Sequence, residues 1–331
     1  MAETRRPTTD AAEEILGGYF PVLDHGFVAL VDYMGGDADV ERAARVSYGY
    51  GTRKTSQTRG LIRYLRRHRH TTPSEMVELK FHVCMPIFVA RQWVRHRTAN
   101  VNEYSGRYSL MPLLFYTPEP GHFALQSPDN KQGRRPEGAD PKLYYEAVER
   151  WESLRGRAGR DYGWLVEQDV ARELARIDLP LSTYTQWYWK IDLHNLFHFL
   201  ALRADPHAQY EIRAFAHVMA GMLKRVAPLS FEAWVDYEFA GAPLSRGELA
   251  ALRQLIEVDP AGAGGVRARG GAALDADALK GCGLSRREIA ELGDKLRVHE
   301  IPAFDLDPAI MMSAEEIGER MQAAVPRLEL D

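Results

Sequence analysis

One short stretch of the chain alternates between apolar and polar side chains. In MVELKFHVC, residues 76–84, the apolar set is Val77, Leu79, Phe81 and Val83, and the polar set is Glu78, Lys80 and His82. An extended backbone points successive side chains to opposite faces, so this pattern predicts a half-buried strand.

The segments around this strand show helical patterns and one further extended pattern. Helices are predicted over residues 36–51, 56–75, 85–97, 141–177, 193–228 and 230–239. The long helical pattern over 193–228 is expected to break near Asp205-Pro206, because proline cannot continue a helix. Residues 181–192 are rich in aromatic and β-branched side chains, which predicts a second strand.

Composition divides the chain into three parts. Residues 1–20 lack the apolar run of a signal peptide and predict a flexible N-terminal arm. One folded domain is predicted over residues 21–241. It includes a long surface loop over residues 117–141, which are rich in proline and glycine. Residues 242–331 predict a C-terminal extension of helices and loops with no evident role, including a Gly/Ala-rich linker over 259–283. No stretch is apolar enough to cross a membrane, so we expect a cytoplasmic protein.

Positive charge is concentrated in one segment of an acidic chain. Residues 53–108 contain twelve lysines and arginines against three glutamates, a net charge of +9 in a chain of −4, which leaves −13 elsewhere. This local positive field favours a small bound anion over a long polyanion. The alternative is a nucleic-acid-binding module that uses the basic 53–108 segment and its interleaved aromatic side chains.

The most basic stretch is RQWVRHRTANVNEYSGRYS, residues 91–109, with four arginines and a histidine against one glutamate. Arginine binds phosphate through a planar fork and keeps its charge when buried, so Arg95, Arg97 and Arg107 predict one or two phosphate contacts. The serine and glycine before Arg107 add a hydroxyl and a place where the backbone can approach a ligand closely.

A second group of arginines and histidines lies farther along the chain. Its members are Arg172, Arg176, His194, His198, Arg203, His207 and Arg213. Arg203 ends the apolar segment LFHFLALR, and by itself it fits a charge at a helix C-terminus or a salt bridge as well as a ligand contact.

Several common site types are missing from the sequence. Neither a nucleotide-binding glycine loop nor a His-Glu-x-x-His zinc helix occurs, and no metal site is expected. Cys84 lies in an apolar strand and Cys282 lies between glycines, so both are interpreted as unreactive thiols. His68 and His70 are interpreted as surface or hydrogen-bonded polar residues.

The stretch RHRTANVNEYSGRYS resembles the signature of the flavin-dependent thymidylate synthases. That signature is Arg-His-Arg, seven residues and a serine, matched by Arg95-His96-Arg97 and Ser105. The likeness continues through HRHTTPSE, PIFVARQW, ARIDLPLSTYTQWYW and NLFHFLALRADPHAQYEIR, over roughly residues 25–240. The resemblance implies an α/β fold of the α+β type, the thymidylate synthase-complementing fold, in which helices flank an antiparallel sheet.

The resemblance also implies a set of site residues. Contacts to dUMP fall on Gln92, Trp93, Val94, Arg95, Glu103, Tyr104, Ser105, Gly106, Arg107, Arg176 and Arg203. Contacts to FAD fall on Thr72, Arg95, His96, Arg97, Glu103, Asp192, Leu193, His194 and His198. Arg203 is the implied catalytic residue, because a cation beside uracil favours ionisation at N3. Ser105 is interpreted as a binding or polarising hydroxyl and not as a covalent nucleophile.

The implied reaction is the reductive methylation of dUMP to dTMP. FAD reduced by NADPH supplies the redox chemistry, 5,10-methylenetetrahydrofolate supplies the carbon, and tetrahydrofolate is released. No cysteine nucleophile is required. The family further implies a homotetramer whose active sites are shared between subunits, with no nucleic-acid or membrane partner.

Some positions depart from the family pattern. Asn100 stands where serine is common, Met76 stands where histidine is common, and Asp192, His194 and His198 stand where some members have Asn or Arg. These differences concern contacts to the flavin rather than the reaction. A flavin-binding protein without catalysis is disfavoured by the site arginines. A structural protein with an incidental basic patch is disfavoured by three matching blocks in order.

Overall fold

The chain forms two compact units in the computed structural model, which describes residues 6–46, 58–128, 133–258, 266–270, 275–297 and 299–325. The first unit contains the described residues up to Trp234 together with those from Phe304 onward, and the second runs from Val235 to Ala303. The boundary predicted at residue 241 falls inside the second unit, and the end of the predicted C-terminal extension belongs to the first.

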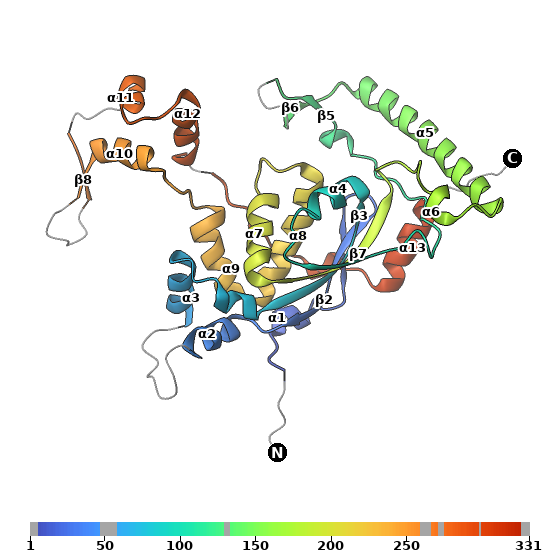
Figure 1. Ribbon diagram of the computed structural model, residues 1–331, viewed down its shortest axis with the longest axis horizontal. Coiled ribbons are helices and arrows are strands. Elements are labelled where there is room, and N and C mark those ends of the chain that lie inside the picture. Colours follow the sequence, from blue (N-terminus) through green and yellow to red (C-terminus); the bar gives the residue numbers. More distant parts are fainter. Residues whose placement is uncertain are drawn as a thin grey trace, which may run out of the picture. The chain divides into compact units, whose positions relative to one another are not determined.

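A five-stranded antiparallel sheet forms the centre of the first unit (Figure 1). Its strands, in spatial order, are β1 (Tyr19–Val22), β2 (Gly26–Met34), β3 (Glu78–Pro86), β7 (Tyr184–Asp192) and β4 (Asn100–Glu103). In the middle strand, Phe81 pairs with Leu30 of β2 and with Trp189 of β7. Both predicted strands and the α/β class with an antiparallel sheet are confirmed.

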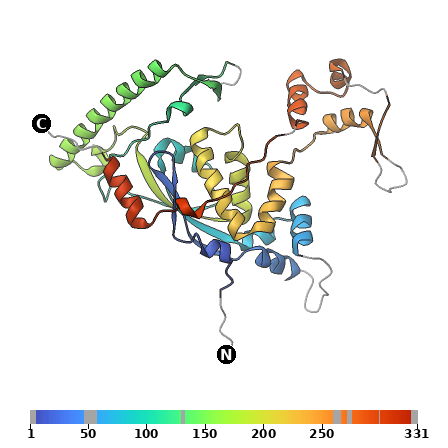
Figure 2. The same cartoon turned by 180° about the vertical axis from the view of Figure 1, so that it is seen from behind.

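Helices cover one face of this sheet (Figures 1 and 2). They are α4 (Ile87–Trp93), α7 (Leu193–Arg203) and α8 (Tyr210–Val226), and α9 (Pro228–Trp234) packs against α8. Trp93 of α4 packs between Trp189 and Phe199, with its ring centroid 5.3 Å and 4.9 Å from theirs. The four alternating apolar side chains of residues 77–83 are all fully buried, as the pattern predicted. This aromatic core fixes the ends of α4 and α7, from which the candidate site is built.

The opposite face of the sheet is only partly apolar. His82 and Tyr188 stack with ring centroids 4.7 Å apart. At one end of this face, α13 (Ala314–Ala324) packs Ile317 into a cluster that contains Cys84. Burial raises the pKa of the Cys84 thiol, which agrees with its interpretation as an unreactive core residue.

The N-terminal residues pack on the first unit. Ala12 in α1 (Asp10–Glu13) and Ile15 just after it are fully buried, and the Tyr33 hydroxyl donates to Glu13 at 2.5 Å. The structure therefore differs from the predicted flexible arm over residues 10–20, because apolar side chains there are covered by the core. Residues 1–5 lie outside the described part of the chain.

Two helices and a 3-10 turn follow β2. They are α2 (Asp37–Val46), α3 (Thr58–Arg67) and η1 (Thr72–Met76). Ile62 and Leu65 of α3 are buried and Leu61 is half-buried, close to the predicted stripe. Arg53 and Lys54 of the basic segment lie outside the described residues.

The segment between β4 and β7 is more regular than predicted. It contains η2 (Pro120–His122), a hairpin of β5 (Ala124–Gln126) and β6 (Arg134–Gly138), and then α5 (Pro141–Glu167) and α6 (Arg172–Ala175). The long surface loop predicted over residues 117–141 contains this short hairpin. Arg134 stabilises this segment by donating to His122 O at 2.8 Å and to Glu211 of α8.

The second unit is small and mostly helical. It contains η3 (Val235–Phe239), α10 (Arg246–Leu255), β8 (Ile256–Val258), β9 (Val266–Ala268), α11 (Ala276–Gly281) and α12 (Arg286–Lys295). Ala251, Leu284 and Leu292 form its apolar cluster. Pro308–Ile310 forms the short η4 in the first unit. Among the described residues, no helix has the length and apolar character needed to span a bilayer.

Candidate active site

Five of the predicted site residues line one pocket of about 290 Å³. The lining residues are Arg95, His96, Arg97, Thr98, Ile191, Asn195, His198, Leu202 and Arg203. His96 and Arg203 are 107 positions apart in the sequence. The fold therefore brings together the basic stretch 91–109 and the later group of arginines and histidines.

Two helix ends place these side chains. The buried ring of Trp93 anchors the end of α4 in the core, so Arg95, His96 and Arg97 follow where the chain leaves that helix. Phe199 and Leu200 bury the last turn of α7 in the same core, and Arg203 is the final residue of that helix. The apolar core therefore fixes both ends while the charged side chains remain on the pocket.

A hydrogen bond joins the two segments. Arg203 Nε donates to His96 Nε2 at 3.0 Å, and Arg203 Nη2 lies 3.4 Å from the Gln92 carbonyl oxygen. A guanidinium can only donate, so His96 Nε2 must be the unprotonated ring nitrogen. Burial, followed by the charges of Arg203 and His198, lowers the pKa of His96 to about 4. His96 is therefore a neutral acceptor at physiological pH.

The arginines of the pocket lack acidic neighbours. No aspartate or glutamate lines the pocket, and Arg95, Arg97 and Arg203 form no ion pair with any residue in the described ranges. Burial and the nearby charge of Arg95 lower the pKa of Arg203. Like charges crowded in this way favour an anionic ligand, which would relieve the repulsion.

A second group of predicted residues meets beside α6. Arg107 Nε forms an ion pair with Glu173 at 3.2 Å, and its backbone N–H lies 3.3 Å from Ser105 Oγ. A Cβ atom added at the buried Gly106 would lie only 3.1 Å from Arg176 Cδ. Arg176 therefore lies directly against the turn formed by Ser105, Gly106 and Arg107, and a larger residue than glycine would push it away.

The remaining residues predicted to contact dUMP have mixed surroundings. Glu103 in β4 accepts a 2.8 Å hydrogen bond from Thr185 Oγ1, and Tyr104 N donates to Gln186 O in the next strand. Val94 is partly exposed at the end of α4. The ring of Trp93 is fully buried in the aromatic core, so its side chain is not available to a ligand.

The residues predicted to contact FAD fall in more than one place. His96, Arg97 and His198 line the pocket described above, whereas Thr72 lines a different pocket of about 670 Å³ formed by α2, α3 and η1. Asp192 caps α7, because its carboxylate accepts from Asn195 N at 2.9 Å and Asn195 Nδ2 at 2.7 Å.

Two features fit a flat, phosphate-bearing cofactor such as FAD. Arginines without carboxylate partners suit phosphate groups. His194 Nδ1 is buried and has no hydrogen-bond partner among the described residues, so a ligand atom can satisfy it. Leu193 fits less well, because its side chain is fully buried and its backbone N–H donates to Val77 O at 2.8 Å.

Sequence reasoning missed four residues that line the pocket: Thr98, Ile191, Asn195 and Leu202. Thr98 directly follows the Arg-His-Arg motif, and Asn195 lies one helical turn before His198, so their positions offered a signal. Ile191 and Leu202 carry no such signal, because an apolar residue that borders a pocket has the same sequence pattern as a core residue.

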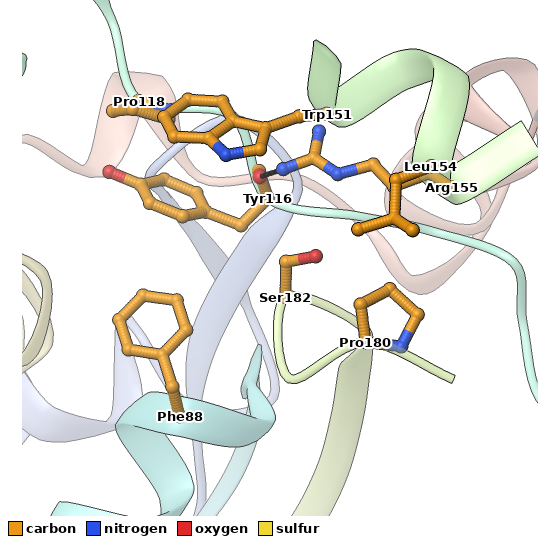
Figure 3. Close-up of a pocket in the computed structure, with 8 residues that line it drawn as sticks. All are labelled: Phe88, Tyr116, Pro118, Trp151, Leu154, Arg155, Pro180 and Ser182. Carbon is orange, nitrogen blue, oxygen red and sulfur yellow. Dashed lines mark hydrogen bonds between the residues drawn. The ribbon is translucent and has the colours of Figure 1, made fainter. Parts of the chain in front are cut away.

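A third pocket, of about 330 Å³, lies beside α5 (Figure 3). Phe88, Tyr116 and Trp151 provide apolar walls. Arg155 reaches across from α5 and donates to Tyr116 O at 2.6 Å and to Thr117 Oγ1 at 2.8 Å. These bonds tie α5 to the segment that follows β4, and no predicted ligand-binding residue lines this pocket. Within the described part of the chain, no three acidic, histidine or cysteine side chains group as metal ligands.

Known proteins match the part of the chain that carries the pocket residues. The family model described as Thymidylate synthase complementing protein matches residues 29–229, a span that includes every predicted site residue. The chain belongs to this family. Relatives include flavin-dependent thymidylate synthases from Wolbachia pipientis wMel and Gluconobacter oxydans (strain 621H), which are 53% and 54% identical over 254 and 256 residues. These matches cover 77% and 76% of this chain, and 89% and 84% of the two relatives.

Two similar solved structures agree with the fold. A UMP/dUMP methylase, PolB from Streptomyces cacaoi bound with 5-Br UMP, superposes with a TM-score of 0.61 at 33% sequence identity. That match covers 66% of this chain and 98% of the methylase. The same methylase bound with 5-Br dUMP gives a TM-score of 0.60 at 32% identity, over 66% of this chain and 97% of the methylase.

Proposed function

We propose that this protein is a flavin-dependent thymidylate synthase that converts dUMP to dTMP. The carbon comes from 5,10-methylenetetrahydrofolate, which leaves as tetrahydrofolate, and the reducing equivalents come from NADPH. The observation that carries this proposal is the acid-free pocket at the Arg-His-Arg motif, where Arg203 is held by a neutral His96.

Arg203 has the properties of a group that activates uracil. It keeps its charge when partly buried, and the bond from Nε to His96 fixes the plane of its guanidinium while other N–H groups remain free to face a ligand. Beside the uracil ring, this cation stabilises negative charge that develops at N3 and the adjoining carbonyl oxygens. Arg203 is therefore the proposed catalytic residue.

The rest of the proposed dUMP site positions the nucleotide. Arg176 lies against the Gly106 turn and is suited to the phosphate, with the Ser105 hydroxyl as a further donor. Arg107 would reach the phosphate by exchanging its exposed ion pair with Glu173, which is worth little in water. Arg95 and Gln92 lie on the Arg203 side of the site and contact the remainder of the nucleotide. Glu103 and Tyr104, which directly precede Ser105 in the sequence, are further proposed contacts to dUMP. Val94, an exposed residue at the end of α4, is the last proposed dUMP contact.

The proposed FAD contacts surround the same pocket. Arg97, His96, His198 and His194 would hold the cofactor through charge and ring nitrogens, and the Asp192 cap fixes the start of the helix that carries the last two. Bound FAD would supply the hydride equivalents drawn from NADPH. The chain's own residues orient the nucleotide and polarise its ring, and the anionic ligands would neutralise the cationic pocket.

The proposed assembly is a homotetramer with shared active sites. Thr72 is a proposed FAD contact but lines a pocket that has no residue in common with the Arg203 pocket. In the proposed assembly, Thr72 of one copy completes the Arg203 pocket of another copy. This arrangement explains why Thr72 and Arg203 line different pockets within one chain. The cytoplasmic location stays a prediction.

The nucleic-acid alternative is not favoured by the surroundings of the basic segment. Arg59 and Arg63 both donate to the carboxylate of Glu232, and Lys80 lies 3.6 Å from Asp32. Cations neutralised by acids of the same chain cannot release counterions from a polyanion, so they add little to nucleic-acid affinity.

The proposed function is tested by spectroscopy and an anaerobic assay. The purified protein is expected to be yellow, to bleach with NADPH, and to form dTMP from dUMP and 5,10-methylenetetrahydrofolate. UMP is assayed in parallel, because the similar solved structure is that of a UMP/dUMP methylase. A colourless protein that takes up no added FAD would refute the flavin mechanism, and a preference for UMP would refute the assignment of dUMP as substrate.

A further inference from the structure

A chain of three polar side chains leads from the protein interior to the proposed dUMP site. Gln92 Nε2 donates to Gln209 Oε1, and Gln209 Nε2 donates to Glu211 Oε2 at 2.8 Å. Gln209 directly precedes α8, and Gln92 lies in the last turn of α4 beside Arg203. Gln92 thus has two contacts: its backbone carbonyl faces Arg203, and its side chain donates to Gln209.

The inner end of this chain is a carboxylate that can only accept hydrogen bonds. Glu211 is 3% exposed, and Arg134 Nη2 lies 2.6 Å and 2.5 Å from its two oxygens. The Tyr116 hydroxyl donates to the same carboxylate at 3.1 Å. Burial opposes ionisation of Glu211, but the bonds and charge of Arg134 together with Gln209 outweigh it and lower the pKa. Glu211 is therefore ionised at neutral pH.

An ionised Glu211 sets the direction of every bond in the chain. The carboxylate accepts, so Gln209 must turn its NH₂ group inward and its oxygen outward. That oxygen also only accepts, so Gln92 must turn its own NH₂ group toward Gln209. Reversing either amide would set two acceptors, or two donors, against each other. Among the described residues, no group donates to Gln92 Oε1.

We infer that Glu211 and Gln209 are positioning residues that hold the Gln92 carboxamide in one orientation, so that Oε1 accepts a hydrogen bond from the deoxyribose 3′-hydroxyl of dUMP. This inference rests on the proposed function, in which Gln92 contacts dUMP. Two groups of dUMP can donate, the imide N3–H and the 3′-hydroxyl. Arg203 favours loss of the N3 proton, so the hydroxyl is the donor that persists through the reaction.

The segment between β4 and α5 thereby acquires a role in substrate recognition. Arg134 belongs to the hairpin strand β6, and its bonds to Glu211 and to His122 O fasten that hairpin against the start of α8. The ring of His122 stacks on Tyr210, next to Gln209, with centroids 3.5 Å apart. Through Glu211, this segment stabilises the ionised acceptor on which the orientation of Gln92 depends.

The test compares dUMP with its analogue that lacks the 3′-hydroxyl, 2′,3′-dideoxyuridine monophosphate. In the FAD-loaded wild-type protein, removal of the hydroxyl is expected to weaken binding about tenfold, the worth of one well-placed hydrogen bond. In Gln209→Met the Gln92 amide is free to turn, so this discrimination is expected to fall to about twofold. Gln209→Met keeps the Glu211–Arg134 pair intact and so protects folding. Glu211→Gln should reduce the discrimination in the same way, because an amide at position 211 no longer dictates direction.

A matched control is Glu248→Gln, which removes a carboxylate that is also 3% exposed and is paired with Lys295 at 2.7 Å in the second unit. It should leave the discrimination at its wild-type value. Equal discrimination in wild type and Gln209→Met would overturn the inference, as would an effect of Gln209→Met that persists in a Gln92→Ala background. Wild-type dTMP formation is measured beside these variants and tests the proposed function by itself.

Discussion

Three arginines of α3, Arg59, Arg63 and Arg66, have an acidic or aromatic partner, whereas the arginines that follow α4 face an acid-free pocket. Arg59 and Arg63 donate to the carboxylate of Glu232 in α9, at 2.9 Å and 2.8 Å. By contrast, Arg95 and Arg97 form no ion pair with any residue that the structure describes. The same side chain therefore stabilises contacts between helices in one region and leaves a charge for a ligand in the other.

Local charge alone therefore does not identify a binding site. An arginine with a carboxylate partner has its charge compensated before any ligand arrives. An arginine crowded by other cations raises the free energy of the ligand-free protein, and an anion lowers it. Arg203 is the second case, because burial and the nearby charge of Arg95 lower its pKa.

The largest effect is expected from removing the central pocket cation. Arg203→Ala should lower the rate of dTMP formation by about 10³-fold, because a preorganised group that stabilises developing charge is lost. FAD should stay bound, since the other proposed flavin contacts remain. Arg203→Lys should recover only part of the rate, because lysine cannot hold the same planar orientation on His96. Unchanged turnover in Arg203→Ala would show that an unpaired pocket arginine is no more important for the reaction than the paired arginines of α3.

A smaller effect is expected where a pocket-side arginine is displaced rather than removed. A Cβ at Gly106 would approach Met111 Sδ at 2.6 Å and Arg176 Cδ at 3.1 Å. Both neighbours are flexible side chains, so Gly106→Ala should fold but shift Arg176, raising KM for dUMP roughly tenfold. Steady-state kinetics with a melting curve would check this. A large loss of thermal stability with normal KM would assign the turn to folding instead.

The pH dependence of stability should sharpen the role of His96. Its pKa falls from 6.5 to about 4 in the folded protein, so its contribution to stability is fully present above about pH 6.5 and is lost as the pH falls toward 4. Gln can accept the same bond from Arg203 but does not titrate. The melting temperature of His96→Gln should therefore fall less than that of wild type between pH 7 and pH 4. Parallel pH profiles would contradict the neutral-acceptor role.

The smallest effect is expected in α3. Arg59 is mostly exposed, so Arg59→Gln should lower the free energy of unfolding by only about 0.5 kcal/mol. The rate of dTMP formation and KM for dUMP should not change. Denaturant unfolding and the standard assay measure both quantities, and a marked loss of nucleotide affinity would place α3 in the binding site.

Much of the fold could be predicted from local patterns. The strict alternation around Phe81, the aromatic run that contains Trp189 and the proline at 206 all act on neighbouring residues, and the structure confirms the two strands and the helix break. The hairpin with Arg134 could not be predicted, because its stability comes from Glu211, 77 residues away. Burial of Ile15 likewise depends on a core built from distant segments.

The sequence predicted which segments form the site, but not how the side chains within it are oriented. Motif resemblance pointed to the Arg-His-Arg segment and to Arg203, and the fold brings His96 and Arg203 into contact. Spacing could not reveal that Trp93, next to these residues, turns its ring into the core. Nor could it reveal the orientation of the Gln92 amide, which depends on the charge of Glu211 in a distant helix.

The most direct test of the contrast is the dissociation constant of dUMP for two matched variants, Arg95→Gln and Arg59→Gln, each loaded with FAD and titrated calorimetrically at the same ionic strength. Both changes remove one positive charge from the same basic segment. We expect Arg95→Gln to weaken dUMP binding about tenfold or more, while Arg59→Gln stays within about twofold of wild type. Equal weakening by both variants would show that dUMP responds only to the total charge, and would contradict the assignment of the acid-free pocket as the binding site.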